Sequence, residues 1–261
     1  MKTRVISAIV MLLIFIPVLI LGDVYYPIMF SILGIMALWE MMNLKKVPMY
    51  MKYISSFICL ALVLFDYQNT NYFNMPNYPI IVGMFLIYSF SIIINKDIKK
   101  YTYSDALWLM IVTLVIGMMF NSLIRIRLFG IEPVIYCFLI STMTDTFALF
   151  GGKKFGKHKL APDISPNKTI EGSVIGSILG TIIASSFHYL VIGNISIGVL
   201  ILLTFVLSIF DQMGDLFFSS IKRFYKVKDF SDLIPGHGGV LDRLDSVIFV
   251  TMVYLLYILI I

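Results

Sequence analysis

The sequence predicts an all-α, polytopic integral membrane protein with about nine transmembrane helices and a cytoplasmic N-terminus. Hydrophobic residues occupy 59% of the 261 positions and charged residues only 13%, and the mean hydropathy is +0.94. A soluble domain carries roughly twice that share of charged residues. Apolar runs of spanning length recur along the chain, and lipid requires each of them to satisfy its own backbone hydrogen bonds, as a helix does.

Nine apolar segments account for these helices. The first follows Lys2 and Arg4 and imitates a signal peptide, but no small-residue cleavage site follows it, so we expect a retained helix. The third and fifth segments are short. In chain order the expected spans are Val5–Leu21, Val24–Met42, Tyr53–Phe65, Tyr78–Ile94, Ala106–Asn121, Pro133–Phe150, Gly172–Ile192, Ile197–Phe218 and Ser246–Ile261.

The basic residues predict the topology. Of the 20 Lys and Arg residues, 18 fall on one side of the expected spans, and only Arg125 and Arg127 fall on the other. The positive-inside rule then places the N-terminus and the basic loops in the cytoplasm, with the protein a multi-pass component of the cytoplasmic membrane. The net charge of +5 therefore reflects topology and contact with anionic membrane lipids, not binding of nucleic acid. Cys59 and Cys137 lie inside apolar segments and are expected to be core residues.

The acidic residues divide the chain into two unlike parts. Residues 1–130 hold five acids, mostly at loop edges, and are predicted to be a scaffold of N-terminal transmembrane helices. Within this part, Glu40 beside Trp39 suits an interfacial anchor. Residues 131–261 hold ten acids and are predicted to form a catalytic transmembrane region with cytoplasmic loops. Charge is costly in hydrocarbon unless it is paired or hydrated, so this gathering of charges indicates a polar reaction site facing the cytoplasm.

Four aspartates in the second part suit a divalent-cation site. Asp211 and Asp215 are spaced four residues apart with Ser219 four further on, which places the three on one helical face. Two carboxylates on one face repel each other, so a cation between them is favoured over a solvated helix end. Gly214 would let another helix or a ligand approach closely. Asp242 and Asp245 begin the last apolar segment, where helix capping is an alternative and compatible role.

The loop between the last two spans contains a glycine-rich turn, Pro235–Gly239, ahead of a helix start. Such turns expose backbone N–H groups to an anion. His237 within it suits a residue that orients the loop better than a catalytic base. A ridge formed by Gly172, Gly176 and Gly180 predicts close helix packing and would also suit a homodimer.

A second polar loop follows the sixth span. Its start fits G-x-x-x-x-G-K, but His158 stands where a P-loop needs Ser or Thr and a membrane span precedes it, so we reject a P-loop. The run Ser165–Thr169 with Glu171 suits phosphate or nucleotide contact, or a capped helix start. Asp145, a lone acid inside the sixth span, is a functional candidate.

Taken together, the polar residues of the second part resemble the signature of the phosphatidate cytidylyltransferase (CDP-diacylglycerol synthase) family. The resemblance covers residues 131–261, while the first part is similar only in hydropathy. Asn167 stands where Lys is common in the family, and Ser231 where Gly is common. The segments that carry the resemblance are Ser165–Gly172, Asp211–Asp215, Ser219–Arg223, Lys228 and Asp229, Pro235, His237–Gly239, Asp242 and Arg243, and Asp245.

The resemblance implies transfer of CMP from CTP to phosphatidic acid, giving CDP-diacylglycerol and pyrophosphate, with Mg²⁺ and room for a second cation. It implies metal binding by Asp211, Asp215, Asp242 and Asp245, with Lys222 and Arg223 completing the catalytic set. The implied substrate-binding residues are Asp145, Ser165, Asn167, Lys168, Thr169, Glu171, Ser219, Lys228, Asp229, His237, Gly238, Gly239 and Arg243.

Two alternatives remain open from the sequence. One is another membrane-embedded lipid-phosphate transferase, although no D-G-x-x-A-R run marks a CDP-alcohol phosphotransferase. The other is a cation-coupled transporter. Transporters place such acids near mid-bilayer in broken helices and often show repeated halves, whereas here the acids gather at one face and the halves differ.

Overall fold

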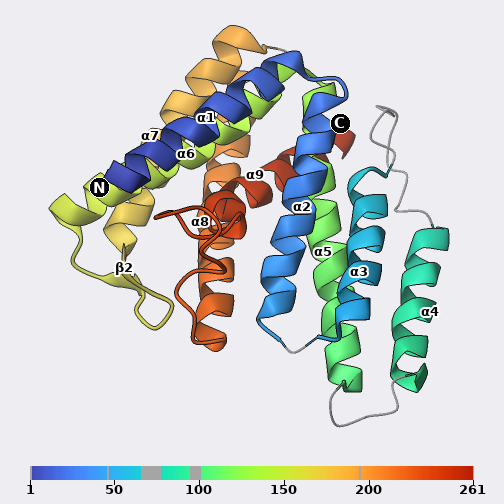
Figure 1. Cartoon of the computed structure of the whole chain (residues 1–261). Helices are drawn as coiled ribbons and strands as arrows, with labels where there is room; N and C mark the ends of the chain where they lie inside the picture. The colour runs from blue at the N-terminus through green and yellow to red at the C-terminus, as the bar shows by residue number, and fades with distance from the viewer. Residues whose placement is uncertain (1, 46, 66–77, 95–100, 194, 261) are drawn as a thin grey trace. The chain divides into compact units, whose positions relative to one another are not determined.

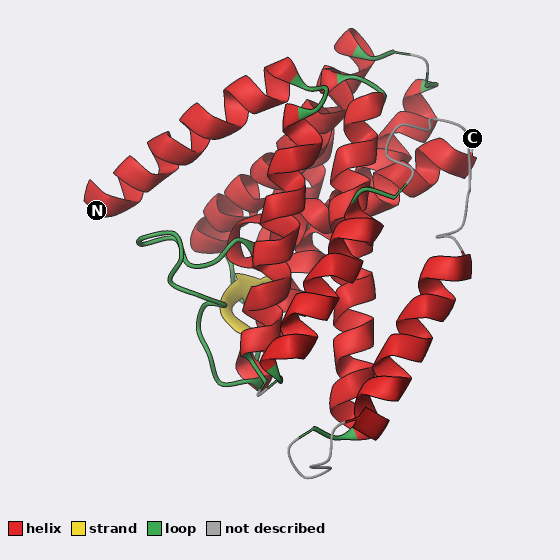
Figure 2. Cartoon of the chain, turned by 45° about the vertical axis from the view of Figure 1, so that its right-hand side comes forward, coloured by secondary structure: helices red, strands yellow, loops and turns green. Residues whose placement is uncertain are grey.

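The computed structural model describes residues 2–45, 47–65, 78–94, 101–193 and 195–260, with every side chain in these ranges except those of residues 2–4 and 78. Over this part of the chain the fold is almost entirely helical, which confirms the predicted class (Figure 2). Part of the charge count that predicts the topology, namely Lys46, Lys96, Lys99 and Lys100, lies outside the described residues. The orientation of the N-terminus therefore stays a prediction.

The described residues form nine helices and one two-stranded sheet (Figure 1). Six of the helices, α2 and α5 to α9, are long and apolar enough to cross a membrane, and α1, α3 and α4 contain shorter apolar stretches. In chain order the elements are α1 Lys2–Leu21, α2 Tyr25–Asn43, α3 Met49–Val63, α4 Tyr78–Ile94, α5 Tyr103–Leu128, α6 Ile131–Phe155, β1 Lys159–Ala161, β2 Ser165–Thr169, α7 Ile170–Val191, α8 Ile197–Phe224 and α9 Leu241–Ile260.

Four helices extend at least five residues beyond an expected span: α6 continues to Phe155, α8 continues to Phe224, and α5 and α9 are the two most informative. α5 has 26 residues instead of a short span ending at Asn121, because the helix continues through Arg125, which is buried. α9 begins at Leu241 instead of Ser246, so Asp242 and Asp245 are helical residues. In both cases charged side chains ended the apolar run in the sequence without ending the helix.

The chain forms two compact units. The first contains residues 1–128 and 229–241, and the second contains residues 129–228 and 242–261. The loop that carries Pro235 and His237 is thus part of the first unit. The division of labour between scaffold and catalytic halves is a statement about function and stays a prediction.

The first unit is built around α5, which packs against α2, α3 and α4. A Cβ at Gly117 of α5 would lie only 2.6 Å from the Cβ of Leu62 on α3, so this crossing requires glycine. The buried Tyr88 hydroxyl of α4 hydrogen bonds to Ser55 of α3 and Thr113 of α5, at 2.8 Å each. One polar side chain therefore links three helices inside an apolar core.

The second unit is built on close packing of α6 against α7, with α8 contacting both. A Cβ at Gly176 would lie 2.6 Å from the carbonyl oxygen of Thr144, and one at Gly180 would lie 2.6 Å from the Thr144 hydroxyl. The close packing predicted for the glycine ridge is confirmed, and its partner is α6 of the same chain. This ridge is therefore no ground for a homodimer, which stays a prediction. The buried Cys137 of this unit and Cys59 of the first unit are both free thiols, as expected.

Candidate active site

One face of α8 carries the predicted row of polar side chains. Ser219 Oγ donates a hydrogen bond of 3.1 Å to Asp215 Oδ1, one helical turn away. Asp211, one turn earlier, is fully buried, and neither of its carboxylate oxygens has a hydrogen bond of ordinary geometry. The Ser141 hydroxyl is close enough to interact with it. A buried carboxylate with so little compensation has capacity for a stronger partner, such as a cation.

Carboxylates from three helices approach one another here. Gly214 admits α9 as predicted, because a Cβ at this position would lie 2.6 Å from the carbonyl oxygen of Asp245. Asp245 interacts electrostatically with Asp215, and Asp211 interacts with both Asp145 and Asp245. These acids come from α6, α8 and α9, so residues far apart in sequence form one negatively charged region in the second unit.

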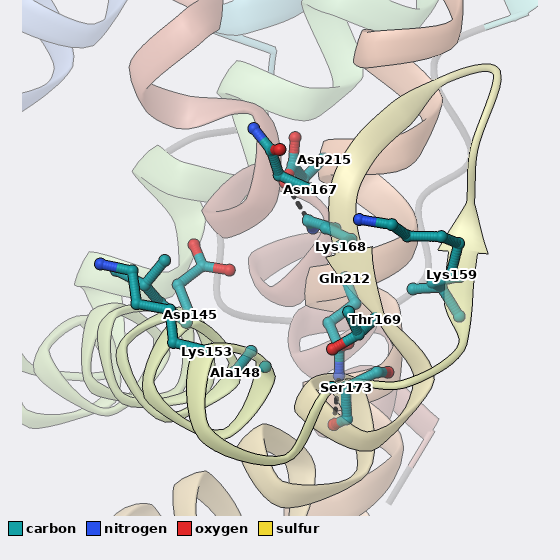
Figure 3. A pocket seen from close by; sticks show the side chains of 14 residues that line it. Asp145, Ala148, Lys153, Lys159, Asn167, Lys168, Thr169, Ser173, Gln212 and Asp215 are labelled. Carbon is teal, nitrogen blue, oxygen red and sulfur yellow. Dashed lines mark hydrogen bonds and ion pairs between the residues drawn. The ribbon is translucent and has the colours of Figure 1, made fainter.

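A pocket of about 590 Å³ is lined by two of these acids and by three lysines. Figure 3 shows Asp145 and Lys153 on α6, Lys168 on β2 and Asp215 on α8, with Lys159 on β1. The pocket therefore presents carboxylates that can bind cations and ammonium groups that can bind phosphate. Its other polar lining residues are Asn167, Thr169, Ser173 and Gln212.

Two ion pairs connect predicted lysines to predicted metal ligands. Lys168 forms an ion pair with Asp215 inside the pocket (Figure 3). Lys222 donates to Asp242 Oδ1 at 2.7 Å, and this pair is nearly inaccessible, with side chains 10% and 3% exposed. Each pair compensates a carboxylate that would otherwise be poorly solvated.

The fit of these residues to Mg²⁺ rests on donor chemistry. Within the described ranges, no three or more His, Cys, Asp or Glu side chains are arranged as a metal site, so common coordination by all four aspartates is not preformed and stays a prediction. Mg²⁺ is usually held by one or two carboxylates together with substrate phosphates, and not by an all-protein cage. The weakly compensated carboxylate of Asp211 fits that smaller requirement.

The loop after α6 folds into a β-hairpin that supplies one wall of the pocket. β1 and β2 pair antiparallel, and α6 continues to Phe155, so the rejected P-loop geometry is absent from this described segment. Thr169 caps α7 by accepting a hydrogen bond from Gly172 N–H at 3.2 Å. The capped helix start, one of the two roles that the sequence left open for this run, is therefore confirmed, and contact with phosphate or nucleotide stays a prediction.

Glu171 closes the base of the hairpin. Its Oε2 accepts the backbone N–H groups of Lys157 at 3.0 Å and His158 at 3.2 Å, and its Oε1 lies 2.6 Å from His158 Nδ1. Glu171 and Ser165 do not belong to the set of pocket-lining residues. The substrate-binding role predicted for both stays a prediction, and the visible role of Glu171 is to hold the hairpin.

The remaining predicted residues lie outside the pocket lining. Arg223 is exposed and donates to the carbonyl oxygens of Ile164 and Val227 at 3.2 Å each, so it ties α8 to the hairpin turn. Lys228 and Arg243, in the same unit, are exposed. Asp229 is exposed in the first unit.

The glycine-rich turn belongs to the first unit, where its backbone has a protein partner. Gly236 and Gly238 have φ of 77° and 87°, which only glycine adopts readily. The N–H groups of Val240 and Leu241, which follow the turn, donate to the carboxylate of Glu40 at 2.8 and 2.9 Å. The interfacial-anchor interpretation of Glu40 is wrong, because this side chain is buried and hydrogen bonded inside the unit.

Sequence reasoning missed four polar pocket residues, one of them Ser173 on α7. Lys153 and Lys159 were counted only as topological charge, and Gln212 was assigned no role. Gln212 Nε2 donates to Ser177 Oγ at 2.8 Å and to the Ser173 carbonyl oxygen at 3.3 Å, joining α8 to α7 beneath the pocket. The signal for the lysines was their closeness in sequence to Lys168, since the end of α6 and the hairpin that follows it line one pocket.

Comparison with known proteins shows the family. The model of the cytidylyltransferase family matches residues 2–261 of the chain. The chain belongs to the cytidylyltransferase family. Among its relatives in the family are proteins named phosphatidate cytidylyltransferase from Staphylococcus aureus (strain COL), 34% identical over 256 residues, and Staphylococcus haemolyticus (strain JCSC1435), 35% identical over 252 residues. Each alignment covers 96% of this chain and 96% of the relative.

Membership confirms the family indicated by the polar motifs of the second part. It also extends the likeness to residues 2–130, where the sequence showed only a similar hydropathy. The first unit is therefore as much a part of the cytidylyltransferase fold as the second. The loop of residues 229–240, here called the signature loop, belongs to this unit. Its contacts within the unit are therefore relevant to function.

Proposed function

We propose that this protein is a phosphatidate cytidylyltransferase, which transfers CMP from CTP to phosphatidic acid and releases pyrophosphate in phospholipid biosynthesis. The main support for this proposal is the family match over nearly the whole chain. Relatives named phosphatidate cytidylyltransferase at 34–35% identity support it further. The pocket agrees in chemistry, because it combines carboxylates with lysines in a membrane protein otherwise poor in charge.

The reaction is an in-line displacement at phosphorus. A phosphate oxygen of phosphatidate attacks the α-phosphorus of CTP, the new P–O bond forms, and the bond to the pyrophosphate oxygen breaks. The attacking phosphate is already ionised at neutral pH, so the protein needs no general base. Catalysis then depends on alignment and on neutralisation of phosphate charge.

The pocket lysines are suited to the anionic reactants. Lys153, Lys159 and Lys168 present ammonium groups to one cavity, where they can hold the triphosphate and balance the charge that moves to the departing pyrophosphate. Lys159 Nζ donates to the Pro166 carbonyl oxygen at 2.6 Å, which orients it within the hairpin. Asn167 is exposed at the pocket wall and can contact the substrate.

A divalent cation, Mg²⁺, completes this proposal. Asp211 and Asp215 on one face of α8 would hold it, with Asp145 and Asp245 close enough to add to the negative field. Held there, a divalent cation would supply neutralisation of the phosphate charge that develops during the transfer. A second cation and a role for Asp242 as a ligand remain part of the prediction.

The reactants determine where the site has to lie. CTP is water-soluble and phosphatidate is embedded in the bilayer, so both meet only at the level of the lipid headgroups. We place the pocket on the cytoplasmic face of the cytoplasmic membrane, because residues 153–168, which run from the end of α6 through the hairpin, carry five of the lysines on the predicted inner side. Contact with anionic lipids would follow from the same charges.

The decisive experiment uses purified protein in liposomes that contain phosphatidate. With CTP and Mg²⁺ we expect CDP-diacylglycerol and pyrophosphate in equal amounts, and neither product when diacylglycerol replaces phosphatidate, because it has no phosphate to attack. Pyrophosphate release without phosphatidate, or transfer from CTP to another acceptor in its place, would contradict the proposal.

A further inference from the structure

A buried carboxylate in the first unit holds the loop that carries the family signature. Glu40 lies on α2 and is only 4% exposed. Its Oε1 accepts hydrogen bonds from Ser231 Oγ at 2.7 Å and from Val240 N–H at 2.8 Å, and its Oε2 accepts Leu241 N–H at 2.9 Å. Hydrogen bonds to a charged acceptor are the strong ones, and three of them give a buried carboxylate substantial compensation.

These three bonds hold both ends of one loop. Ser231 precedes the glycine-rich turn and Leu241 follows it, so a single side chain ties together residues ten positions apart in sequence. A Cβ at Gly239 would collide with the Glu40 carboxylate, which shows that the loop backbone lies directly against it. The missing side chain at Gly239 is therefore a requirement of this contact.

Other bonds set the internal shape of the loop. The N–H groups of His237 and Gly238 donate to the Ile234 carbonyl oxygen at 2.8 and 3.1 Å. Ser7 of α1 donates to the Pro235 carbonyl oxygen at 3.1 Å, and its oxygen lies 2.7 Å from His237 Nδ1. That pair of contacts favours the His237 tautomer with hydrogen on Nδ1, since the serine proton is directed to Pro235.

We infer that Glu40 is a positioning residue for the cytidylyltransferase reaction, acting by anchoring the signature loop and the first residue of α9. This inference rests on the proposed function. Asp242, a predicted metal ligand, follows Leu241 directly in the chain. Increased mobility of the Leu241 backbone would therefore also displace Asp242. Misplacement of a catalytic group by about 1 Å is enough to slow a reaction by about 100-fold.

Glu40→Gln tests the inference because it keeps the side-chain volume and removes one acceptor. The amide oxygen of Gln can replace Oε1, but its NH₂ group would face the Leu241 N–H, donor against donor. In full-length protein in nanodiscs, we expect faster hydrogen exchange at Leu241 and a fall in kcat of about 10- to 100-fold. KM for CTP should change by less than about twofold, because an interaction that acts on the transition state lowers kcat alone.

The matched control is Asp105→Asn in the same unit. Asp105 also caps a helix, accepting Thr102 N–H at 3.0 Å and the Thr102 hydroxyl at 2.7 Å, and it pairs with Lys45. We expect this variant to keep loop exchange and kcat within about twofold of wild type, because its hydrogen bonds are outside the signature loop. Glu40→Ala removes all three bonds. It should therefore show faster hydrogen exchange at Leu241 and a larger fall in kcat than Glu40→Gln.

Several results would overturn the inference. These are wild-type exchange at Leu241 in Glu40→Gln, an equal loss of kcat in Asp105→Asn, or a raised KM with unchanged kcat. If Glu40→Ala fails to fold, the isosteric Gln variant carries the test. Absence of cytidylyltransferase activity in the wild type would refute the proposed function instead, while exchange at Leu241 would still report whether Glu40 anchors the loop.

Discussion

Replacing Lys222 by Met should destabilise the folded protein by about 3–5 kcal/mol, because it leaves a buried carboxylate without its counter-charge. Lys222 Nζ lies 2.7 Å from Asp242 Oδ1, and both side chains are at least nine-tenths removed from solvent. Methionine matches the length and apolar stem of lysine, so packing changes little. The loss corresponds to a change of more than about 100-fold in the equilibrium constant for unfolding.

A second ion pair in the chain provides the control. Lys45 and Asp105 are separated by 3.0 Å, but their side chains are 24% and 27% exposed. Water stabilises the carboxylate that Lys45→Met leaves behind, so this variant should lose less than about 1 kcal/mol. The two pairs have similar N–O distances, but Asp105 is more exposed and keeps its two hydrogen bonds from Thr102, and both differences favour a smaller loss for Lys45→Met.

The assay is denaturant unfolding in mixed micelles, followed by the signal of helical structure. The double variant Lys222→Met with Asp242→Leu should recover most of the loss, since removing both charges leaves nothing uncompensated. A loss below about 1 kcal/mol for Lys222→Met, equal to that of Lys45→Met, would refute the argument. It would mean that water or another group solvates Asp242 in the absence of Lys222.

Three further predictions concern turnover and packing. Asp245→Asn should abolish CDP-diacylglycerol formation while membrane insertion is retained, and near-normal activity of the purified variant would remove Asp245 from the site. Lys153→Gln should raise KM for CTP about 10-fold in steady-state assays, since a charge-assisted hydrogen bond contributes about 1.5–3 kcal/mol; an unchanged KM would exclude a contact with the triphosphate. Gly176→Ala should lower thermal stability in detergent by about 1–3 kcal/mol, because the new Cβ would lie 2.6 Å from a carbonyl oxygen. Gly198→Ala, where a Cβ meets nothing within 4 Å, should be neutral or stabilising by helix propensity, and equal losses at both glycines would contradict the packing argument.

Membrane segments were predictable where the ends of the apolar run coincide with the ends of the helix. α4 was expected and found at Tyr78–Ile94. The prediction failed where a helix continues past charged residues, as α5 does through Arg125 and α9 does at Asp242. Hydropathy detects contact with lipid, whereas a helix ends where its backbone geometry or its caps end it.

The site was predictable in its residue types and only partly in its geometry. The spacing of Asp211 and Asp215 placed both on one face of α8, because helical periodicity is local. Their pairing partners were not predictable, since Lys168 reaches Asp215 only through the hairpin fold. The pocket role of Lys153, at the end of α6, and of Lys159, in the hairpin, likewise depends on how these two segments fold around one cavity.

By itself, the sequence determined that this chain crosses a membrane as helices, carries most of its acidic residues in the second half and contains the motifs of a cytidyl transfer reaction. Those properties depend on local sequence or on overall composition. Composition, helical periodicity and sequence motifs are therefore enough to predict them. Only the tertiary structure decided that the glycine ridge packs on α6 and that Glu40, a residue of the supposed scaffold, holds the signature loop. Such contacts join residues up to 201 positions apart, and no local sequence pattern predicts which buried acceptor a distant N–H group will bond.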